Sequence, residues 1–544
     1  MKKLVSRFMA VLMAMTMILS MSMTAFAAGD ATRLTGTGKL TVNNTVAGKT
    51  LDLYQIFTAT KNEAGNVAYT LNPEYEGFFQ NKISGASTSA GEELSEKAYD
   101  YVKEQVGKDG KNGVNFAKAM LTWILSNTST VDATHKAVTT TDGSTVISDL
   151  AYGYYVVYPL GATDTSAAPG EQDYTSVASL VSVTGDTSIN MKSNYPTVVK
   201  KVNDKNADDV NIGDTVTYTL TSKVPDMTGY TSYVFNFKDT LSAGLTFKEI
   251  TSVTVGKTTI TKVDAGQEAN DTYTLTHDGQ KITITMNNFL ASNKDKAGQE
   301  IKVTYKATLN KNAVTGFDAN KNSATIEYSN NPGTTDKGES EPSIVDVHTF
   351  NFTIFKYYLT GETKNALANA EFELYKANEA GDAADENAKI NIVDEGEGVY
   401  RQATPEEVTA TNPKFESAKI VSDADGKVLV KGLKAGTYYL RETKAPDGYN
   451  KLLSDITVEI KANYDKTTGK LTSYSVDYTY NGKTTTGTAI TNKTDSPEVA
   501  VENKTGAQLP STGSKGALMV TLAGIVLFGA LTASKVFGKK KAKN

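Results

Sequence analysis

Apolar and polar residues alternate along most of the chain, from about residue 40 to residue 503. Runs such as TVTYTLTSKV and KITITMNNFL carry an apolar side chain at nearly every second position, and turn residues separate one run from the next. A period of two is typical of strands that bury one face. Many short strands joined by turns predict an all-β fold built from tandem immunoglobulin-like sandwiches.

Residues 91–127 depart from this alternation. Their apolar side chains recur at helical spacing, which predicts two helices inserted into the first β-rich domain. One face of the first helix is lined by Leu94, Ala98, Tyr101 and Val102, and one face of the second by Phe116, Met120 and Trp123.

Three blocks of strands follow one another, and the chain length suits about three domains. We predict an N-terminal β-rich domain with the helical insertion at 28–194, a middle domain at 195–345 and a C-terminal domain at 346–507. The polar segment Gly333–Ser343 is predicted to be a linker.

Both ends of the chain carry targeting patterns. Residues 1–27 combine a basic start, an apolar run and the cleavage pattern Ala25-Phe26-Ala27, which predicts a signal peptide and export. Residues 508–544 combine LPSTG, an apolar run and a basic tail, which looks like a cell-wall sorting signal, the substrate of a sortase. A plain C-terminal membrane anchor is the alternative.

Composition narrows the functional classes. The formal net charge is −5 and the strands show no basic face, so we expect no nucleic-acid partner. The three histidines (His135, His277 and His348) are far apart and accompany no nucleophile motif or metal-ligand cluster, so we expect no enzyme, no cofactor and no metal site. Exported domains often rely on disulfides, and this chain has no cysteine.

The stretch YYLRETKAPDGY places a carboxylate on an apolar strand face. Tyr438, Leu440 and Glu442 point the same way, and a buried carboxylate is costly unless it is paired, neutralised or used. In the same block, Lys356 shares a face with Phe352 and Ile354, and Asn503 shares one with Val499 and Val501. Asn492, in phase with Ile490, remains an alternative to Asn503.

The middle block repeats this order of lysine, acid and asparagine. Lys200 alternates with Val198 and Val202, Asp239 follows Phe235 and Phe237, and Asn322 precedes Ala324 and Ile326. Burial favours a neutral, nucleophilic amine and a protonated acid that polarises the asparagine amide. Release of ammonia would leave a Lys–Asn isopeptide, a cross-link that replaces the missing disulfides.

These residues resemble a known family. Tyr438 to Tyr449 matches the E-box of the sortase-assembled major pilins of Gram-positive bacteria, which contain Cna-B-type domains, and LPSTG matches their sorting motif. The resemblance implies that Glu442 promotes a Lys356–Asn503 isopeptide. It also implies that Asp239 promotes one between Lys200 and Asn322.

The resemblance further implies a covalent polymer. A sortase thiolate attacks the Thr512 carbonyl, Gly513 leaves, and a lysine of another subunit resolves the acyl-enzyme. The motif consists of Leu509, Pro510, Ser511, Thr512 and Gly513. Implied partners are a pilus-specific class C sortase, the housekeeping sortase with a peptidoglycan precursor, copies of the chain itself, minor tip or base pilins and host ligands. The implied location is a cell-wall-anchored surface pilus.

The acceptor lysine departs from the family pattern. Pilins commonly read Tyr-Pro-Lys, whereas here Tyr195-Pro196 precedes Thr197. Lys192 is the first choice because alternation with Met191 turns it toward solvent. Lys201, which faces away from Lys200, is the second. In the first domain the strand YGYYVVYP carries no acid, so we expect no isopeptide there.

A wall-anchored monomeric adhesin or other ligand-binding surface protein is the alternative function. The chain has no Asp-x-Ser-x-Ser loop of the kind that metal-dependent adhesion requires. An SDS-resistant ladder of polymers distinguishes a shaft subunit from a lone adhesin, which gives one band.

Overall fold

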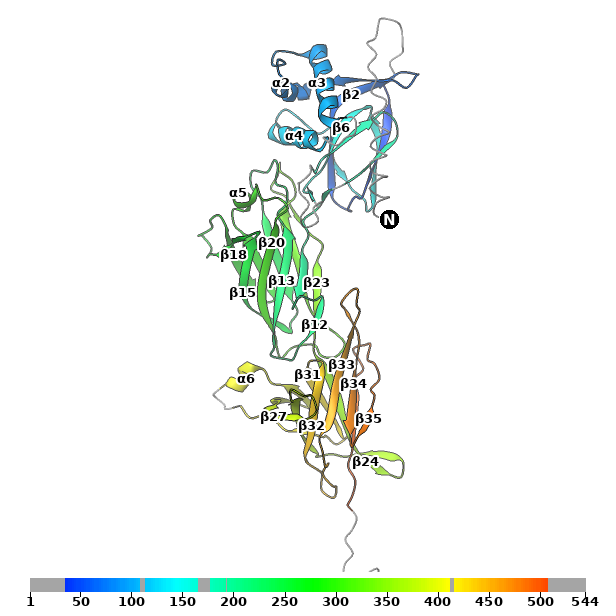
Figure 1. Ribbon diagram of the computed structural model, residues 1–544, viewed down its shortest axis with the longest axis vertical. Coiled ribbons are helices and arrows are strands. Elements are labelled where there is room, and N and C mark those ends of the chain that lie inside the picture. The colour runs from blue at the N-terminus through cyan, green and yellow to red at the C-terminus, as the bar shows by residue number, and fades with distance from the viewer. Residues whose placement is uncertain (1–34, 108–112, 165–176, 192, 411–414, 507–544) are drawn as a thin grey trace, which may run out of the picture. The chain divides into compact units, whose positions relative to one another are not determined.

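Strands account for 49% of the structure and helices for 11%, which confirms the all-β prediction. The computed structural model describes residues 35–107, 113–164, 177–191, 193–410 and 415–506 (Figure 1). Its contacts separate two units, each described on its own. One comprises Met1–Thr349 with Tyr464–Leu471, and the other comprises Phe350–Asn463 with Thr472–Asn544.

The N-terminal part of the first unit contains two main sheets. One has the strand order β5-β1-β9, and the other has the order β3-β2-β6-β8 with β4 paired to β2. Short strands β7 and β10 pair with each other. The bounds are β1 Thr37–Asn43, β2 Thr50–Lys61, β3 Val67–Leu71, β4 His135–Thr139, β5 Ser144–Ala151, β6 Gly153–Pro159, β7 Thr163–Asp164, β8 Ser179–Val183, β9 Thr187–Asn190 and β10 Ser193–Asn194.

The predicted helical insertion is confirmed as α3 (Gly91–Val106) and α4 (Gly113–Ser126). Leu94, Ala98, Val102, Phe116 and Met120 are buried as expected, whereas Tyr101 and Trp123 are half-buried against the same cluster. The sequence pattern missed the shorter helix α2 (Glu76–Lys82), which follows the 3-10 turn Pro73–Tyr75. Seven residues are too few for helical periodicity to be recognised, although the adjacent buried residues Phe78 and Phe79 interrupt strand alternation there.

The middle part of the first unit is a sandwich of two sheets. Their orders are β11-β13-β20-β15-β16 and β12-β23-β21-β14-β19-β18-β17, with β22 also paired to β21. Apolar side chains from both sheets form one buried cluster between Val198 and Val347. The bounds are β11 Val199–Val202, β12 Ala207–Asp209, β13 Thr215–Lys223, β14 Phe235–Leu241, β15 Leu245–Val255, β16 Thr258–Thr259, β17 Thr261–Lys262, β18 Thr272–Asp278, β19 Lys281–Met286, α5 Phe289–Asn293, β20 Glu300–Leu309, β21 Asn320–Ser329, β22 Lys337–Glu339 and β23 Ser343–His348.

The linker predicted at Gly333–Ser343 was wrong. This segment contains β22 and the first residue of β23, and both strands pair with β21. Lys337 and Glu339 on β22 are exposed, so the polar composition reflects a short peripheral strand. The predicted boundary at residue 345 lies within β23.

The second unit is also a sandwich of two sheets. Their orders are β25-β24-β31-β29-β28, with β36 beside β24, and β27-β26-β32-β33-β34-β35, with β30 beside β26. The bounds are β24 Phe350–Thr360, β25 Thr363–Ala366, β26 Glu371–Ala377, β27 Ala384–Lys389, β28 Ile392–Gly396, β29 Val399–Gln402, α6 Pro405–Thr409, β30 Ile420–Val421, β31 Lys427–Leu433, β32 Gly436–Lys444, β33 Ile456–Tyr464, β34 Leu471–Tyr480, β35 Lys483–Thr485 and β36 Glu498–Glu502.

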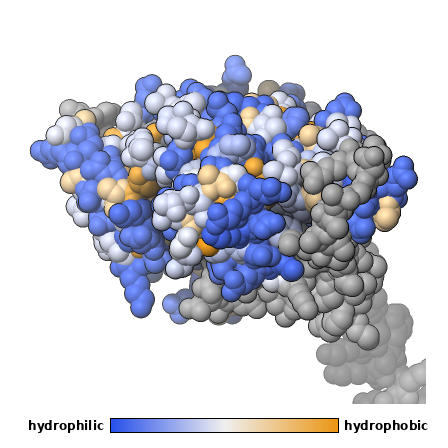
Figure 2. Space-filling model, turned by 90° about the horizontal axis from the view of Figure 1, so that it is seen from above, coloured by the Kyte–Doolittle hydropathy of each residue, from blue (hydrophilic) through white to orange (hydrophobic). Residues whose placement is uncertain are grey.

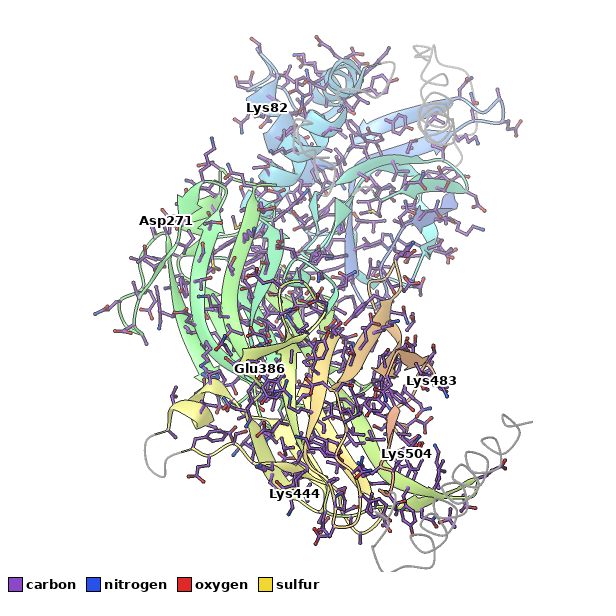
Figure 3. All side chains as sticks on the ribbon, turned by 60° about the horizontal axis from the view of Figure 1, so that its bottom comes forward. Lys82, Asp271, Glu386, Lys444, Lys483 and Lys504 are labelled. Carbon is purple, nitrogen blue, oxygen red and sulfur yellow. The ribbon has the colours of Figure 1, made fainter. Side chains whose placement is uncertain are left out.

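Charged side chains lie mainly at the surface. Figure 3 labels Lys82, Glu386, Lys444, Lys483 and Lys504, all of which are exposed. The face seen in Figure 2 is mostly hydrophilic, with hydrophobic residues scattered among the polar ones. No helix in the described part of the chain is long and apolar enough to cross a bilayer. The predicted signal peptide and sorting segment lie outside the described residues.

Candidate functional site

Lys356, Glu442 and Asn503 meet inside the C-terminal sandwich. Lys356 lies on β24 and Glu442 on β32 of the facing sheet, and Asn503 directly follows β36. Their exposed fractions are 0%, 2% and 2%. The parallel pairing of β24 with β36 brings the first and last strands of this domain together, because Lys356 is opposite Val501.

The Glu442 carboxylate contacts both predicted reactants. Its Oε1 lies 3.0 Å from Lys356 Nζ. Its Oε2 accepts hydrogen bonds from Asn503 Nδ2 at 3.1 Å and from the Leu452 backbone N–H at 2.7 Å. One acid therefore touches the nucleophile and the amide at once, which is the arrangement that proton transfer between them requires.

The turn that follows β32 orients the Asn503 amide. The Asn450 carbonyl accepts a second hydrogen bond from Asn503 Nδ2, at 2.6 Å, and the Asn450 N–H donates to the Lys504 carbonyl at 2.9 Å. Gly448, in the same turn, has φ +88°, a conformation that residues with a Cβ rarely adopt. The DGYN stretch after the E-box strand thus helps to fix the reacting side chain.

Burial changes the protonation of Lys356. It lowers the lysine pKa to about 8, and the Glu442 charge opposes this shift only in part. Near neutral pH a useful fraction of the amine is therefore neutral and able to act as a nucleophile.

Lys200, Asp239 and Asn322 form a second buried cluster in the middle sandwich. Their exposed fractions are 1%, 2% and 0%. Lys200, on β11, donates a hydrogen bond across the core to Asp239 Oδ2 on β14 of the facing sheet. Asn322, on β21, lies beside Asp239, because Leu241 pairs with Asn322 and Asp239 with Ala324.

Tyr305 connects the members of the middle cluster. Its hydroxyl accepts hydrogen bonds from Lys200 Nζ at 2.8 Å and from Asn322 Nδ2 at 2.7 Å, and it donates one to Asp239 Oδ2 at 2.8 Å. Lys200 Nζ also lies 4.9 Å from the centre of the Tyr218 ring. Sequence reasoning missed Tyr305, although it alternates with Ile301, Val303 and Ala307 and so marks a hydroxyl on an apolar strand face.

The protonation of the middle cluster follows from its burial. Removal from water lowers the pKa of Lys200 and raises the pKa of Asp239, and in each case the partner's charge opposes the shift. Both directions favour transfer of a proton from the ammonium to the carboxylate. The result is a neutral amine beside a carboxylic acid.

Two segments match pilin-related family models. Residues 212–332 match the Gram-positive pilin backbone subunit 2, Cna-B-like domain, and residues 354–474 match the SpaA prealbumin-like fold domain. The first segment contains Asp239, Tyr305 and Asn322, and the second contains Lys356 and Glu442. Lys200 and Asn503 lie outside both matches.

A curated relative agrees with these matches. The chain is 28% identical over 350 residues to the trypsin-resistant surface T6 protein of Streptococcus pyogenes serotype M6. The match covers 58% of this chain and 53% of that protein, so the chain spans about half the length of the curated relative. The chain is homologous to Gram-positive backbone pilins.

Solved pilin structures resemble the chain at lower sequence identity. The T6 backbone pilin of S. pyogenes serotype M6 shares 16% identity and a TM-score of 0.46, and the alignment covers 89% of this chain and 100% of that one. BcpA, the major pilin subunit of Bacillus cereus, shares 17% identity and a TM-score of 0.35, with 87% and 100% covered.

The remaining predicted residues lie elsewhere. Asn492 is exposed in a turn, where its side chain bonds Thr494 and Asp495, so the structure brings Asn503 and not Asn492 to Glu442. Lys201 is half-buried, and its Nζ donates to Asn206 Oδ1 at 2.6 Å. Lys192 and the sorting motif Leu509, Pro510, Ser511, Thr512 and Gly513 fall outside the described residues.

The N-terminal part of the first unit shows no comparable cluster among its described residues. None of the buried polar side chains between residues 35 and 191 is a lysine. The buried Asp52 accepts a hydrogen bond from the Ala137 N–H at 2.7 Å, and burial raises its pKa. The expected lack of an isopeptide in this domain stays a prediction.

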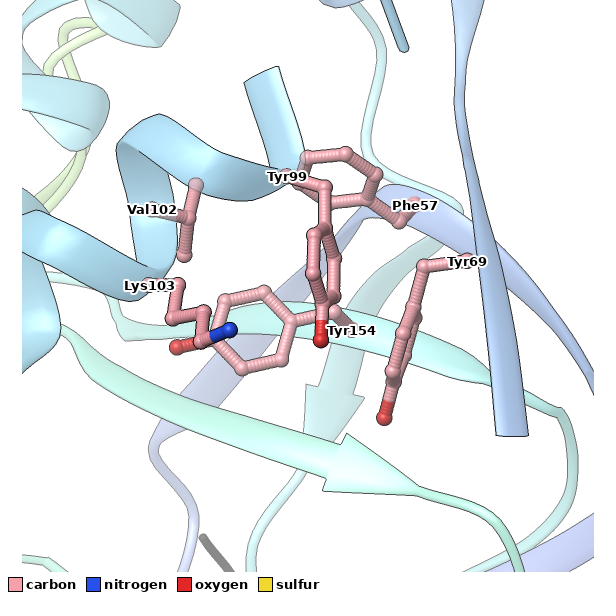
Figure 4. A pocket seen from close by; sticks show the side chains of 6 residues that line it. All are labelled: Phe57, Tyr69, Tyr99, Val102, Lys103 and Tyr154. Atoms are coloured by element: carbon pink, nitrogen blue, oxygen red, sulfur yellow. The ribbon is translucent and has the colours of Figure 1, made fainter. Parts of the chain in front are cut away.

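An aromatic pocket lies beside α3 in this part of the chain (Figure 4). The Tyr69 and Tyr99 rings stack with their centroids 6.1 Å apart, and Lys103 stands at the side of the pocket. Its lining contains no acid. The other residues that line it are Phe57, Val102 and Tyr154. Across the described residues there is no group of metal-ligating side chains, and the buried lysine–acid–asparagine clusters remain the candidate site.

Proposed function

We propose that the protein is the structural shaft subunit of a surface pilus, stiffened by two isopeptide bonds that it forms without an enzyme. The observation that carries this proposal is the presence of a buried lysine, acid and asparagine in each of two successive sandwiches. Both sandwiches match pilin-related family models.

The same reaction accounts for both clusters. The acid accepts a proton from the lysine, and the neutral Nζ attacks the asparagine Cγ. The Nζ–Cγ bond forms, the Cγ–Nδ2 bond breaks, and Nδ2 leaves as ammonia. Burial supplies the neutral amine, and the folded core holds the reactants and the acid together, so the high effective concentration of an intramolecular reaction makes a separate enzyme unnecessary.

Polymerisation is proposed to use the sorting motif. A pilus-specific class C sortase cleaves between Thr512 and Gly513 and transfers the Thr512 acyl group to a lysine of another copy. Lys192 is the proposed acceptor and Lys201 the second choice. The housekeeping sortase then joins the last subunit to a peptidoglycan precursor, which anchors the exported fibre to the cell wall. Minor tip or base pilins and host ligands complete the proposed partners.

Mass spectrometry of the intact full chain tests the cross-links. We expect the wild type to weigh two ammonia molecules less than its sequence. Glu442→Ala and Asp239→Ala should each recover the mass of one, because each removes the acid of one cluster. A wild-type mass equal to that of the sequence would overturn the isopeptide proposal.

Electrophoresis of wall extracts tests polymerisation. We expect an SDS-resistant ladder from the wild type and from Lys201→Ala, and only monomer from Thr512→Ala and Lys192→Ala. A ladder that persists in Lys192→Ala and disappears in Lys201→Ala would transfer the acceptor role to Lys201. A single band from the wild type would contradict the shaft function and favour an anchored monomer.

A further inference from the structure

The Tyr305 hydroxyl occupies the centre of the middle cluster. It lies within 2.8 Å of the attacking nitrogen, Lys200 Nζ, within 2.7 Å of the departing nitrogen, Asn322 Nδ2, and within 2.8 Å of Asp239 Oδ2. A single hydroxyl thus contacts both nitrogens that exchange places on Asn322 Cγ. A role limited to packing requires no such contact.

Two oxygen atoms of the cluster accept no hydrogen bond from the described residues. Asp239 Oδ1 and Asn322 Oδ1 are buried, and neither has a hydrogen-bond partner among the described residues. The lysine proton is received by Asp239 Oδ2, the oxygen that contacts both Lys200 Nζ and the Tyr305 hydroxyl. Once protonated, Oδ2 can donate to the Tyr305 oxygen instead of accepting from it. The Tyr305 O–H is then free to face its other contact, the departing nitrogen Asn322 Nδ2.

We propose that Tyr305 is a catalytic residue of the middle cross-link and relays a proton from Lys200 Nζ to Asn322 Nδ2 as ammonia departs. This inference rests on the proposed isopeptide function and assigns the second proton transfer of that reaction. It applies to the middle domain alone.

The relay conserves atoms and charge. Attack of the neutral Lys200 amine on Asn322 Cγ gives a tetrahedral centre with a surplus proton on Nζ. Nζ passes this proton to the Tyr305 oxygen, and the Tyr305 O–H proton moves to Nδ2. The Cγ–Nδ2 bond then breaks, Nδ2 leaves as ammonia, and Tyr305 ends the reaction protonated as it began. Burial raises the pKa of Tyr305 well above its usual range, which keeps the hydroxyl protonated between transfers.

The C-terminal cluster provides a control within the same chain. There Asn503 Nδ2 donates to Glu442 Oε2 and to the Asn450 carbonyl, and Glu442 contacts both reacting side chains. The Asn450 carbonyl oxygen can accept a hydrogen bond but cannot supply a proton. Tyr305 belongs to the middle cluster, so the Lys356–Asn503 reaction is expected to proceed independently of any change at Tyr305.

The test compares the rates at which the two cross-links form in one polypeptide. The full chain is synthesised in a cell-free reaction and quenched at intervals, and peptide mass spectrometry measures the fraction of each cross-linked peptide pair. Tyr305→Phe removes only the hydroxyl. We expect it to slow the Lys200–Asn322 cross-link about 100-fold, since a positioned proton donor contributes about that much, and to leave the Lys356–Asn503 rate unchanged.

Two further variants separate relay from folding. Tyr328→Phe removes another buried hydroxyl from the same core, at the far end of β21 from Asn322, and should not change the middle rate. Tyr305→His restores a group that both accepts and donates protons. It should recover part of the rate lost in Tyr305→Phe and make that rate depend on pH near the imidazole pKa.

The possible outcomes are distinct. A wild-type rate in Tyr305→Phe would overturn the relay while leaving the isopeptide proposal intact. Equal slowing by Tyr328→Phe would also overturn it, because general loosening of the core would then explain the effect. Absence of both cross-links from the wild type would instead refute the proposed function on which the relay rests.

Discussion

The middle and C-terminal sandwiches bring the same three side-chain types together through different strand arrangements. In the C-terminal domain, Lys356 lies on β24 and Asn503 directly follows β36, the neighbouring parallel strand of the same sheet, and Glu442 reaches them from the facing sheet. In the middle domain, Asp239 and Asn322 come from neighbouring strands, and Lys200 crosses the core to meet them. Both domains have the lysine, the acid and the asparagine in the same order along the chain, but they distribute these residues differently between the two sheets.

The two domains also orient the amide differently. A backbone carbonyl in the turn after β32 holds Asn503, whereas a tyrosine hydroxyl on β20 holds Asn322. Common to both is full burial of the lysine and acid in direct contact. The buried environment of the three groups, and not one particular strand arrangement, therefore makes the proposed reaction possible.

The largest expected effect is the loss of either cross-link. Asn503→Ala and Asn322→Ala remove the electrophile but keep the lysine–acid pair. By analogy with disulfides that close loops of about 100 residues, each should lower the free energy of unfolding by about 4–5 kcal/mol. The two losses should agree within about 0.5 kcal/mol, because loop entropy depends only logarithmically on length.

Calorimetry on the full chain measures these losses domain by domain. Each variant should lower the unfolding temperature of its own domain by roughly 10–20 °C and leave the other domain unchanged. A much larger loss of stability in one domain would show that its cross-link contributes more than the entropy of loop closure. The two cross-links would then not be energetically equivalent.

The next effect is a pH dependence specific to uncross-linked Lys356. Before cross-linking, the folded-state pKa of Lys356 is about 8, below the usual 10.5. Asn503→Ala keeps the amine in this uncross-linked form, so the unfolded chain is expected to bind more protons between these pH values. Stability of the C-terminal domain should therefore rise by about 3 kcal/mol as pH increases from about 8 to 10.5.

Urea unfolding at the two pH values measures this rise. The double variant Asn503→Ala, Lys356→Met is the matched control, because it lacks the titrating amine, and its stability should not rise in the same way. If both proteins show the same pH dependence, the burial of Lys356 is not its cause.

A smaller effect on stability should distinguish the turn that holds the Asn503 amide from the tyrosine that holds the Asn322 amide. Gly448→Ala places a Cβ where φ is +88°, with no atom near enough to clash, so backbone strain alone is expected to destabilise the turn by about 1 kcal/mol. The Lys356–Asn503 cross-link should then form more slowly while the middle one forms normally. Time-resolved peptide mass spectrometry measures the rates at which the two cross-links form. If Gly448→Ala slows both cross-links, the effect of this turn is not confined to the C-terminal domain.

The smallest effect is expected from a substitution of Asn492, the alternative to Asn503 as the reacting asparagine. Asn492→Ala removes hydrogen bonds within an exposed turn, so the domain should lose less than about 1 kcal/mol and keep its cross-link. Loss of the ammonia deficit in this variant would make Asn492, and not Asn503, the reactant.

The sequence by itself determined which polar residues lie on buried faces. A strand turns its side chains to alternate faces, so neighbours in sequence were sufficient to predict that Lys356, Glu442, Lys200 and Asp239 are buried. The same local reasoning predicted α3 and α4 from helical spacing. It failed for α2, which is too short to show a period, and for β22, whose polar residues suggested a linker.

Only the tertiary structure decided which of these groups meet. Asn492 and Asn503 are equally in phase with apolar neighbours, but β36 pairs with β24 and carries Asn503 to Glu442, whereas Asn492 lies in an exposed turn. Tyr305 and the Asn450 carbonyl join their clusters through pairings between distant strands and turns. Alternation fixes the face of a side chain because it is a local property, whereas partners depend on register between segments far apart in the chain.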